Sequence, residues 1–342
     1  MRYNLRSIFR RGITALTVLV FLLVSMTACA QENMDNENGF EKYVTVAGRQ
    51  MRVVLYGNIT RSQEEVSFTD SSKSTLVMLP GLGVASPNLY FKPLAQELDE
   101  NFNIIVVEPL GYGLSETAST QRSVANMNSD LNEALEALGV EECILLVHSI
   151  SGVYGLNFAL DYPDKVKGFI GVDNTVYEDG LAEAFAMEKE YMLNGIEEFN
   201  AVRDSFSSVE EFRQALTQNP EEYGVELPQV QGYTYSEADL EEYIYAVSLS
   251  ANESIESEVN QMDQTLLAVK GKKFPDTLPV LVMVSSDNVQ NIPIWETAHR
   301  DQLNLENGKH KMCVLEGSHY IWYTNLTGVV EQIKQWQTEN QF

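Results

Sequence analysis

Hydrophobic residues along this chain gather in short runs of four or five, separated by longer stretches of mixed polarity. Strands that are buried on both faces show this pattern, and their alternation with helical stretches predicts a parallel sheet joined by right-handed crossovers. Six runs have this character: Thr75–Leu79, Ile104–Val107, Cys143–Val147, Phe169–Val172, Val280–Val284 and Met312–Leu315.

Two further strands and two helices complete the predicted frame. Tyr43–Val46 and Met51–Tyr56 flank a short turn and predict an antiparallel hairpin at the sheet edge. Asn126–Leu138 places its apolar residues on one helical face, and Ile150–Leu160 follows the third apolar run directly. The predicted fold class is therefore α/β, with a mostly parallel eight-stranded sheet flanked by helices.

About a hundred residues between Val172 and Val280 are too many for a single crossover. The segment has helical periodicity, and its part from Val176 to Lys270 contains eleven Phe and Tyr residues, so we expect an inserted helical cap over residues 175–270. Most of its aromatic rings should form the core of the cap itself. The sheet would then be built from residues 40–174 and 271–342.

The N-terminus has the pattern of an export signal. Four arginines and no acidic residue precede an almost unbroken apolar run, Ile13–Met26, and small residues then lead to Cys29. This favours a bacterial lipoprotein signal over residues 1–29, with Cys29 lipidated, followed by a flexible tether over residues 30–39. Ordinary secretory cleavage and an uncleaved membrane anchor are the alternatives. All three place the protein outside the cytoplasm, and the first puts it at the outer face of the cell membrane.

The charge balance narrows the range of partners. The 342 residues include 23 Lys and Arg against 49 Asp and Glu, a net charge of −26, which argues against nucleic acid or an anionic membrane surface as the main partner. The segment Val176–Lys270 alone has a net charge of −17, so neutral or cationic small molecules should approach the cap more easily than anions. The membrane would be contacted only through the N-terminus. Cys143 and Cys313 lie within apolar runs, which favours buried free thiols.

The sequence HSISG at 148–152 places Ser149 between a strand and a helix. Such a turn, the nucleophile elbow, lifts a serine hydroxyl above the sheet and points the next backbone N–H, here that of Ile150, toward a substrate oxyanion. Small residues normally flank the serine, whereas this chain has Val147 and Ser151 at the two usual glycine positions. A serine after a strand is often only a helix cap, so the motif needs support from its surroundings.

That support comes from the glycine-containing loops after the preceding runs. The first buried run leads into LPGLG at 79–83, where the glycines permit a tight turn and leave the Leu82 N–H free as a second oxyanion donor. EPLGYGLS follows the next run at 108–115. With these motifs in this order, the chain from Tyr43 to Trp336 resembles the α/β-hydrolase superfamily.

The resemblance implies a Ser-His-Asp triad whose members follow one another along the chain as serine, acid and histidine, the order of that superfamily. The acid usually follows the seventh strand, which indicates Asp287, and the histidine follows the eighth, which indicates His319. Asp173, at the end of the sixth strand, is the alternative acid, since some relatives place the acid there. His319 would act as the base, and the acid would orient and stabilise its ring.

The three other histidines, His148, His299 and His310, are weaker candidates for the base. The resemblance makes His148 a packing neighbour of Ser149, while His299 lies in a polar helix and His310 precedes a strand. The sequence contains no cluster with metal-ligand spacing and no phosphate-binding glycine loop followed by Lys, so we expect neither a metal nor another cofactor.

These features favour an exported serine hydrolase that cleaves a small or medium carboxylic ester through an acyl-enzyme. Dehalogenases and epoxide hydrolases of the superfamily carry Asp at the elbow, so Ser149 argues against those reactions. An amidase or aminopeptidase is an alternative, although LPGLG differs from the HGGPG-type motif of proline-releasing relatives. A non-catalytic ligand-binding protein is another, because a fold does not fix a function and Val147 departs from the motif.

Overall fold

The computed structural model describes residues 39–61 and 66–342. The predicted signal with Cys29, and the predicted tether except Gly39, lie outside the described residues. From Glu41 to Phe342 the chain forms one compact unit. No helix within the described residues has both the length and the apolar character needed to cross a membrane.

Eight strands form one sheet in the order β1-β2-β6-β5-β7-β8-β9-β10. The pairs from β6 to β10 are parallel, and β2 pairs with β6 antiparallel. The sheet strands are β1 (Phe40–Val46), β2 (Arg49–Tyr56), β5 (Thr75–Leu79), β6 (Asn103–Val107), β7 (Cys143–His148), β8 (Val166–Val172), β9 (Val280–Ser285) and β10 (His310–Leu315). A separate two-stranded sheet, which the sequence pattern did not predict, contains β3 (Ile59–Arg61) and β4 (Val66–Phe68).

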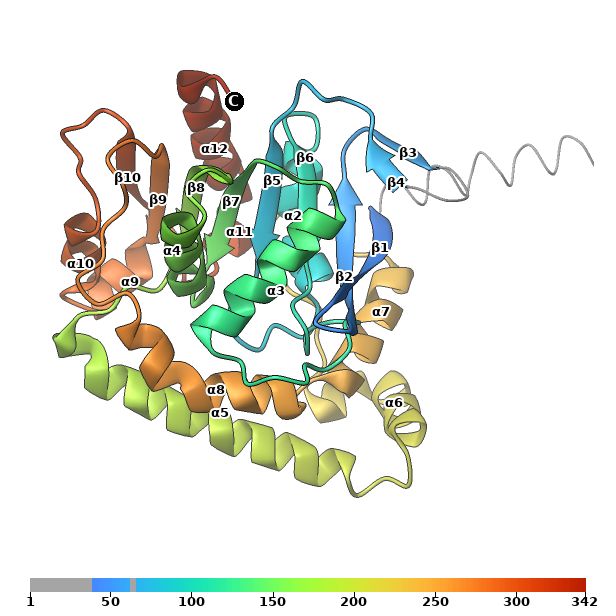
Figure 1. Ribbon diagram of the computed structural model, residues 1–342. Helices are drawn as coiled ribbons and strands as arrows, with labels where there is room; N and C mark the ends of the chain where they lie inside the picture. Colours follow the sequence, from blue (N-terminus) through green and yellow to red (C-terminus); the bar gives the residue numbers. More distant parts are fainter. Residues whose placement is uncertain (1–38, 62–65) are drawn as a thin grey trace, which may run out of the picture. The chain divides into compact units, whose positions relative to one another are not determined.

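Helices cover both faces of the large sheet: α3 and α4 lie on one face, and α2 and α12 on the other (Figure 1). The helices outside the insertion are α2 (Pro87–Leu98), α3 (Val124–Ala137), α4 (Ser151–Asp161), α9 (Ser286–Asn291), α10 (Trp295–Asp301), α11 (Ile321–Thr324) and α12 (Leu326–Asn340). The predicted fold class, an α/β fold with a mostly parallel eight-stranded sheet, is confirmed.

The burial pattern explains why these segments form a sheet. Every residue of β6, β7 and β9 is buried, as expected for central parallel strands with helices on both faces. At the edge, β1 and β2 are joined by Ala47 and Gly48, which both have positive φ angles, 49° and 74°. Two successive positive φ angles are characteristic of the type I′ turn, whose twist suits a tight hairpin. The predicted edge hairpin is therefore present.

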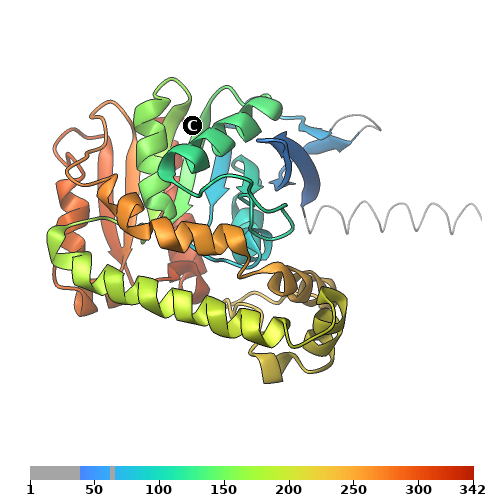
Figure 2. The same cartoon turned by 60° about the horizontal axis from the view of Figure 1, so that its bottom comes forward.

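The segment between β8 and β9 is helical. It contains η1 (Asp179–Leu181), α5 (Ala182–Arg203), α6 (Val209–Gln218), η2 (Pro220–Tyr223), α7 (Glu237–Leu249) and α8 (Glu253–Leu267). Helices α5 and α8 run side by side across one end of the sheet (Figures 1 and 2). Several cap aromatics pack around Phe212 in a core of their own, as predicted, whereas Tyr191 is 79% exposed.

Candidate active site

Ser149 occupies a strained turn between β7 and α4. Its φ angle is +53°, a left-handed value that residues with a side chain seldom adopt. The Ser149 carbonyl accepts hydrogen bonds from the Gly152 N–H at 2.9 Å and from the Thr175 N–H at 2.7 Å, which hold the turn in place. Strain of this kind persists only where surrounding structure enforces it, and it concentrates at functional sites.

The two departures from the usual elbow sequence each have a structural explanation. Val147 fits because Gly155 stands opposite it on α4, where an added Cβ would lie 2.9 Å from the Val147 Cγ1. Ser151 also has a structural role. Its hydroxyl donates a hydrogen bond to the Pro80 carbonyl and so connects the loop after β5 to the elbow. The space normally kept free by a glycine on the strand is here provided by the helix.

The loop of residues 80–83 packs directly against the elbow. A Cβ added to Gly81 would lie 3.2 Å from the Ser149 Cβ, closer than most side-chain contacts, so glycine favours this approach. Gly83 has a φ of +72°, and its N–H donates to the Tyr112 hydroxyl oxygen at 3.3 Å. Within the described part of the chain, neither the Leu82 N–H nor the Ile150 N–H has an acceptor. Neither predicted oxyanion donor would therefore have to break a hydrogen bond within the described residues in order to serve that role.

Asp173, and not Asp287, is the acidic partner of His319. The Asp173 Oδ2 lies 2.7 Å from the His319 Nδ1, and the carboxylate is fully buried. The same carboxylate accepts hydrogen bonds from the Ser285 N–H and hydroxyl, the Asn288 amide and the Trp295 indole. Burial alone would raise the pKa of Asp173, but the hydrogen bonds and the nearby His319 outweigh burial and lower it.

The preference for Asp287 as this partner is wrong, for a reason visible in the turn after β9. Ser285 caps the short helix α9 by accepting from the Asn288 N–H at 3.1 Å, and both residues face Asp173. Asp287 lies between them on the outer side, where its side chain is exposed and only its backbone N–H contacts Gly317. Adjacent helical positions point in different directions, so the sequence position alone could not identify the inward residue.

His148 forms a hydrogen bond with the backbone of His319. The His148 Nε2 lies 2.9 Å from the His319 carbonyl oxygen and its Nδ1 lies 2.6 Å from the Tyr90 hydroxyl, so the imidazole donates from Nε2 and accepts at Nδ1. The two imidazole rings are 4.4 Å apart between centroids, which brings His319 beside the elbow. Burial, followed by the nearby His319, lowers the pKa of His148 well below its usual value and keeps it neutral. The predicted packing role of His148 fits this geometry.

The two remaining histidines have structural partners of their own. His299 is buried on α10, contrary to the polar setting expected for it, and its Nε2 lies 2.7 Å from the Asn174 carbonyl oxygen. The His310 Nδ1 accepts from the Asn304 N–H at 2.9 Å. Neither ring contacts Asp173 or His148, so His319 is the histidine that the fold places against the elbow.

Glu188, on helix α5 of the insertion, lies close enough to His319 to interact with it electrostatically. Glu188 and Met192 lie one turn apart on α5, and Met192 reaches to 3.7 Å from the Cβ position on Gly83. The Glu188 side chain is open to solvent on one side, yet burial on the other raises its pKa, while the nearby His319 opposes that rise. Its negative charge also contributes to the raised pKa of Tyr320. The sequence did not distinguish Glu188 from the many other acids of the insertion.

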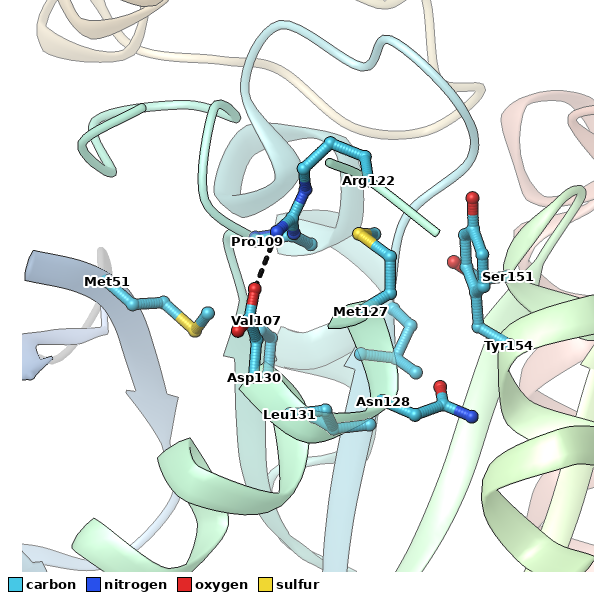
Figure 3. Close-up of a pocket in the computed structure, with 11 residues that line it drawn as sticks. Met51, Val107, Pro109, Arg122, Met127, Asn128, Asp130, Leu131, Ser151 and Tyr154 are labelled. Atoms are coloured by element: carbon cyan, nitrogen blue, oxygen red, sulfur yellow. Dashed lines mark hydrogen bonds and ion pairs between the residues drawn. The ribbon is translucent and has the colours of Figure 1, made fainter. Parts of the chain in front are cut away.

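A small pocket of about 30 Å³ is lined in part by residues of α3 and α4 (Figure 3). Ser151 and Tyr154 line it, and Arg122 reaches across it to Asp130, with 2.6 Å between the ion-paired atoms. Ligand pockets usually exceed 300 Å³, so this cavity is too small for an ester substrate. Residues 39–61 and 66–342 contain no group of three His, Cys, Asp or Glu side chains arranged to hold a metal ion.

The family model described as alpha/beta hydrolase fold matches residues 74–255. The Bacillus subtilis (strain 168) protein YbdG is 29% identical over 189 residues, which are 54% of this chain and 52% of YbdG. The chain thus matches about half the length of that relative.

Solved structures agree on the fold. A thermophilic esterase from Thermogutta terrifontis aligns with a TM-score of 0.57 at 16% identity, covering 88% of this chain and 99% of that one. The epoxide hydrolase CorEH aligns with a TM-score of 0.56 at 19% identity, covering 87% and 98%. Identities this low establish the architecture alone, and the two neighbours are named for different reactions.

Proposed function

The chain belongs to the α/β-hydrolase family, and we propose that it is a serine hydrolase that cleaves small or medium carboxylic esters. In this proposal Ser149 is the nucleophile, His319 the general base and Asp173 the acid of the triad. The observation that carries it is the 2.7 Å contact between Asp173 and His319 beside the strained Ser149 turn. Acyl transfer suits a serine at the elbow, whereas direct displacement on an alkyl carbon needs a carboxylate there.

The reaction would proceed in two halves. His319 takes the proton from the Ser149 hydroxyl as its oxygen attacks the ester carbonyl, and the resulting oxyanion accepts hydrogen bonds from the Leu82 and Ile150 N–H groups. The carbon–oxygen bond to the alcohol then breaks, and His319 returns the proton to the departing alcohol. Water repeats the sequence on the acyl-serine, with His319 again as base, and releases the carboxylic acid.

Asp173 would act through the orientation and charge of His319. Its lowered pKa keeps it ionised at neutral pH, so the carboxylate can accept the Nδ1–H and leave the other ring nitrogen as the base. The same negative charge stabilises the imidazolium that forms during each half-reaction. Further donors to Asp173, from Ser285 and Trp295, hold the carboxylate in one orientation.

The preferred substrate would be neutral or cationic. Glu188 lies within electrostatic range of His319 and Tyr320 at the cap side of the site, so an ammonium group on a substrate would find a partner there. We expect Glu188→Gln to lower kcat/KM for a cationic ester several-fold while leaving a neutral ester of the same acyl group unchanged. Measuring both esters at low and high salt tests this preference, and equal losses for the two would contradict it.

Covalent labelling tests the proposed activity directly. A fluorophosphonate probe should modify Ser149 in the wild-type protein, and both Ser149→Ala and His319→Ala should abolish labelling while the circular dichroism spectrum stays unchanged. Hydrolysis of a short-chain p-nitrophenyl ester should fall by at least about 10⁴-fold in Ser149→Ala. A folded wild-type protein without labelling or ester turnover would favour the ligand-binding alternative.

Export and lipidation of Cys29 are a separate part of the proposal, supported by the sequence pattern that precedes it. Mass spectrometry of the mature N-terminus should find a lipid-modified Cys29 as the first residue. A mature chain that begins at Gln31 would instead indicate ordinary secretory cleavage after Ala30.

A further inference from the structure

Helix α8 of the insertion carries a buried carboxylate, Glu258. Each of its two oxygens accepts a hydrogen bond from a tyrosine hydroxyl. The Tyr112 hydroxyl donates to the Glu258 Oε2 and the Tyr154 hydroxyl donates to its Oε1, both at 2.8 Å. The glutamate is 1% exposed. Burial raises the pKa of Glu258, while the two phenol hydrogen bonds and the charge of Arg122 oppose that rise.

These two phenols belong to the two segments that present the proposed oxyanion donors. Tyr112 lies in the loop after β6, and its hydroxyl oxygen accepts the Gly83 N–H next to Leu82. Tyr154 lies on α4, one turn beyond Ile150. Glu258 therefore joins both sides of the proposed oxyanion hole through one side chain, although it comes from the inserted helices.

Packing around α8 makes this connection rigid. Ile255 and Val259, on either side of Glu258, form an apolar cluster with Tyr112, against which Leu82 packs. The rigidity matters because hydrogen-bond donors stabilise a developing oxyanion only if they are already in position when the charge appears.

An apolar side chain would fill the Glu258 site without the cost of burying a carboxylate. Two hydrogen-bonded carboxyl oxygens add direction: they fix the orientation of each phenol, and the Tyr112 oxygen then fixes the Gly83 amide. The hydrogen bonds of Glu258 therefore serve the positions of the neighbouring backbone amides more than the stability of the fold.

We propose that Glu258 is a positioning residue that sets the spacing of the Leu82 and Ile150 N–H groups from the cap. The inference rests on the proposed serine hydrolase activity and deepens it, because it makes the inserted helices part of the catalytic geometry. Glu258 itself touches no reacting atom.

The test separates transition-state binding from ground-state binding. Glu258→Gln preserves the shape but replaces one acceptor oxygen with a donor, so it should lower kcat about tenfold and leave KM within twofold. The affinity for an alkyl boronic acid, which forms a tetrahedral adduct with the serine, should weaken by a similar factor. Glu256→Gln is the matched control, since Glu256 is an exposed glutamate on the same helix, and it should match the wild type.

A double-mutant cycle provides the second readout. Tyr112→Phe removes the hydroxyl that links Glu258 to Gly83, so it should reproduce the kcat loss, and combining it with Glu258→Gln should add little further. This variant also keeps the test available if Glu258→Gln does not fold. Wild-type kcat and boronate affinity in the folded variants, whatever their melting temperatures, would overturn the inference and leave the proposed function intact. Absence of wild-type turnover would overturn both.

Discussion

The sheet and the inserted helices are held together by different interactions. Strands β6 and β7 are buried along their whole length, and their helices cover them with apolar side chains. Helix α7 of the insertion also meets the rest of the protein through two ion pairs, one buried and one partly exposed. Its Asp239 lies 2.6 Å from the Lys92 Nζ of α2, and its Glu242 lies 3.0 Å from the Arg52 Nη1 of β2.

Apolar burial mainly stabilises the sheet, whereas the ion pairs mainly fix the position of α7. Apolar burial is the larger source of stability but is non-directional, so it permits small shifts between packed elements. Buried ion pairs add little net stability, yet a shift that breaks one leaves an uncompensated charge and costs several kcal/mol. Asp239 and Glu242 lie three residues apart on one face of α7, and together they fix how that helix sits on the sheet.

Breaking the buried pair should give the largest stability change. Lys92→Met leaves the Asp239 carboxylate buried without its cation, which should cost about 3–5 kcal/mol of unfolding free energy in urea titrations. The double variant Lys92→Met/Asp239→Leu should recover most of that loss, because it removes both charges. The exposed pair Lys270–Asp179 is the control, and Lys270→Met should cause no measurable change. Equal destabilisation by the single and double variants would show that the charges do not account for the attachment.

A pair of glycine substitutions sharpens the same comparison. On α4, a Cβ at Gly155 would lie 2.9 Å from both Phe169 and Val147, so Gly155→Ala should destabilise the protein by about 1–3 kcal/mol. On α5, Gly195 has no atom within 4 Å of its Cβ position, so Gly195→Ala should stabilise the protein by about 0.5–1 kcal/mol through helix propensity. Thermal or urea unfolding measures both, and effects of the same sign would contradict the described packing of the two helices.

The smallest expected effect concerns the two thiols of the sheet. Both cysteines are free, but Cys143 is buried in the central strand β7, whereas Cys313 on the edge strand β10 is only half-buried. Burial raises the pKa of Cys143 to about 12 and that of Cys313 to about 11. Iodoacetamide at pH 8 should therefore leave Cys143 unmodified in the folded protein and react slowly with Cys313, with both reacting quickly in urea. Faster labelling of Cys143 than of Cys313 would contradict this order.

Much of the sheet could be predicted because its signals are local. Fully buried parallel strands give continuous apolar runs, and the glycine positions of the loops reveal where the backbone approaches closely, as Gly81 approaches Ser149. His319 was predicted from the resemblance to the α/β-hydrolase superfamily, whose histidine follows the last strand of the sheet. The interpretation of Val147 as a weakness of the motif missed Gly155, eight residues later, which provides the space on the helix side.

Side-chain direction and long-range pairing could not be predicted. Asp173 and Asp287 both follow buried strands, and only the turn after β9 shows that Asn288 faces inward and Asp287 outward. Lys92 and Asp239 are 147 residues apart, and each resembles an ordinary solvated charge in the sequence. Glu258 is likewise indistinguishable from its acidic neighbours until α8 is packed against the two phenols.

The most direct test of the proposed triad compares the two aspartates. Asp173→Asn should lower kcat/KM for a short-chain p-nitrophenyl ester by about 10³ to 10⁴-fold, because the neutral amide neither selects the His319 tautomer nor stabilises its cation. Asp287→Asn, an identical chemical change at an exposed position, should stay within twofold of the wild type. A large loss in Asp287→Asn together with near-normal activity in Asp173→Asn would contradict the assignment of Asp173 as the catalytic acid.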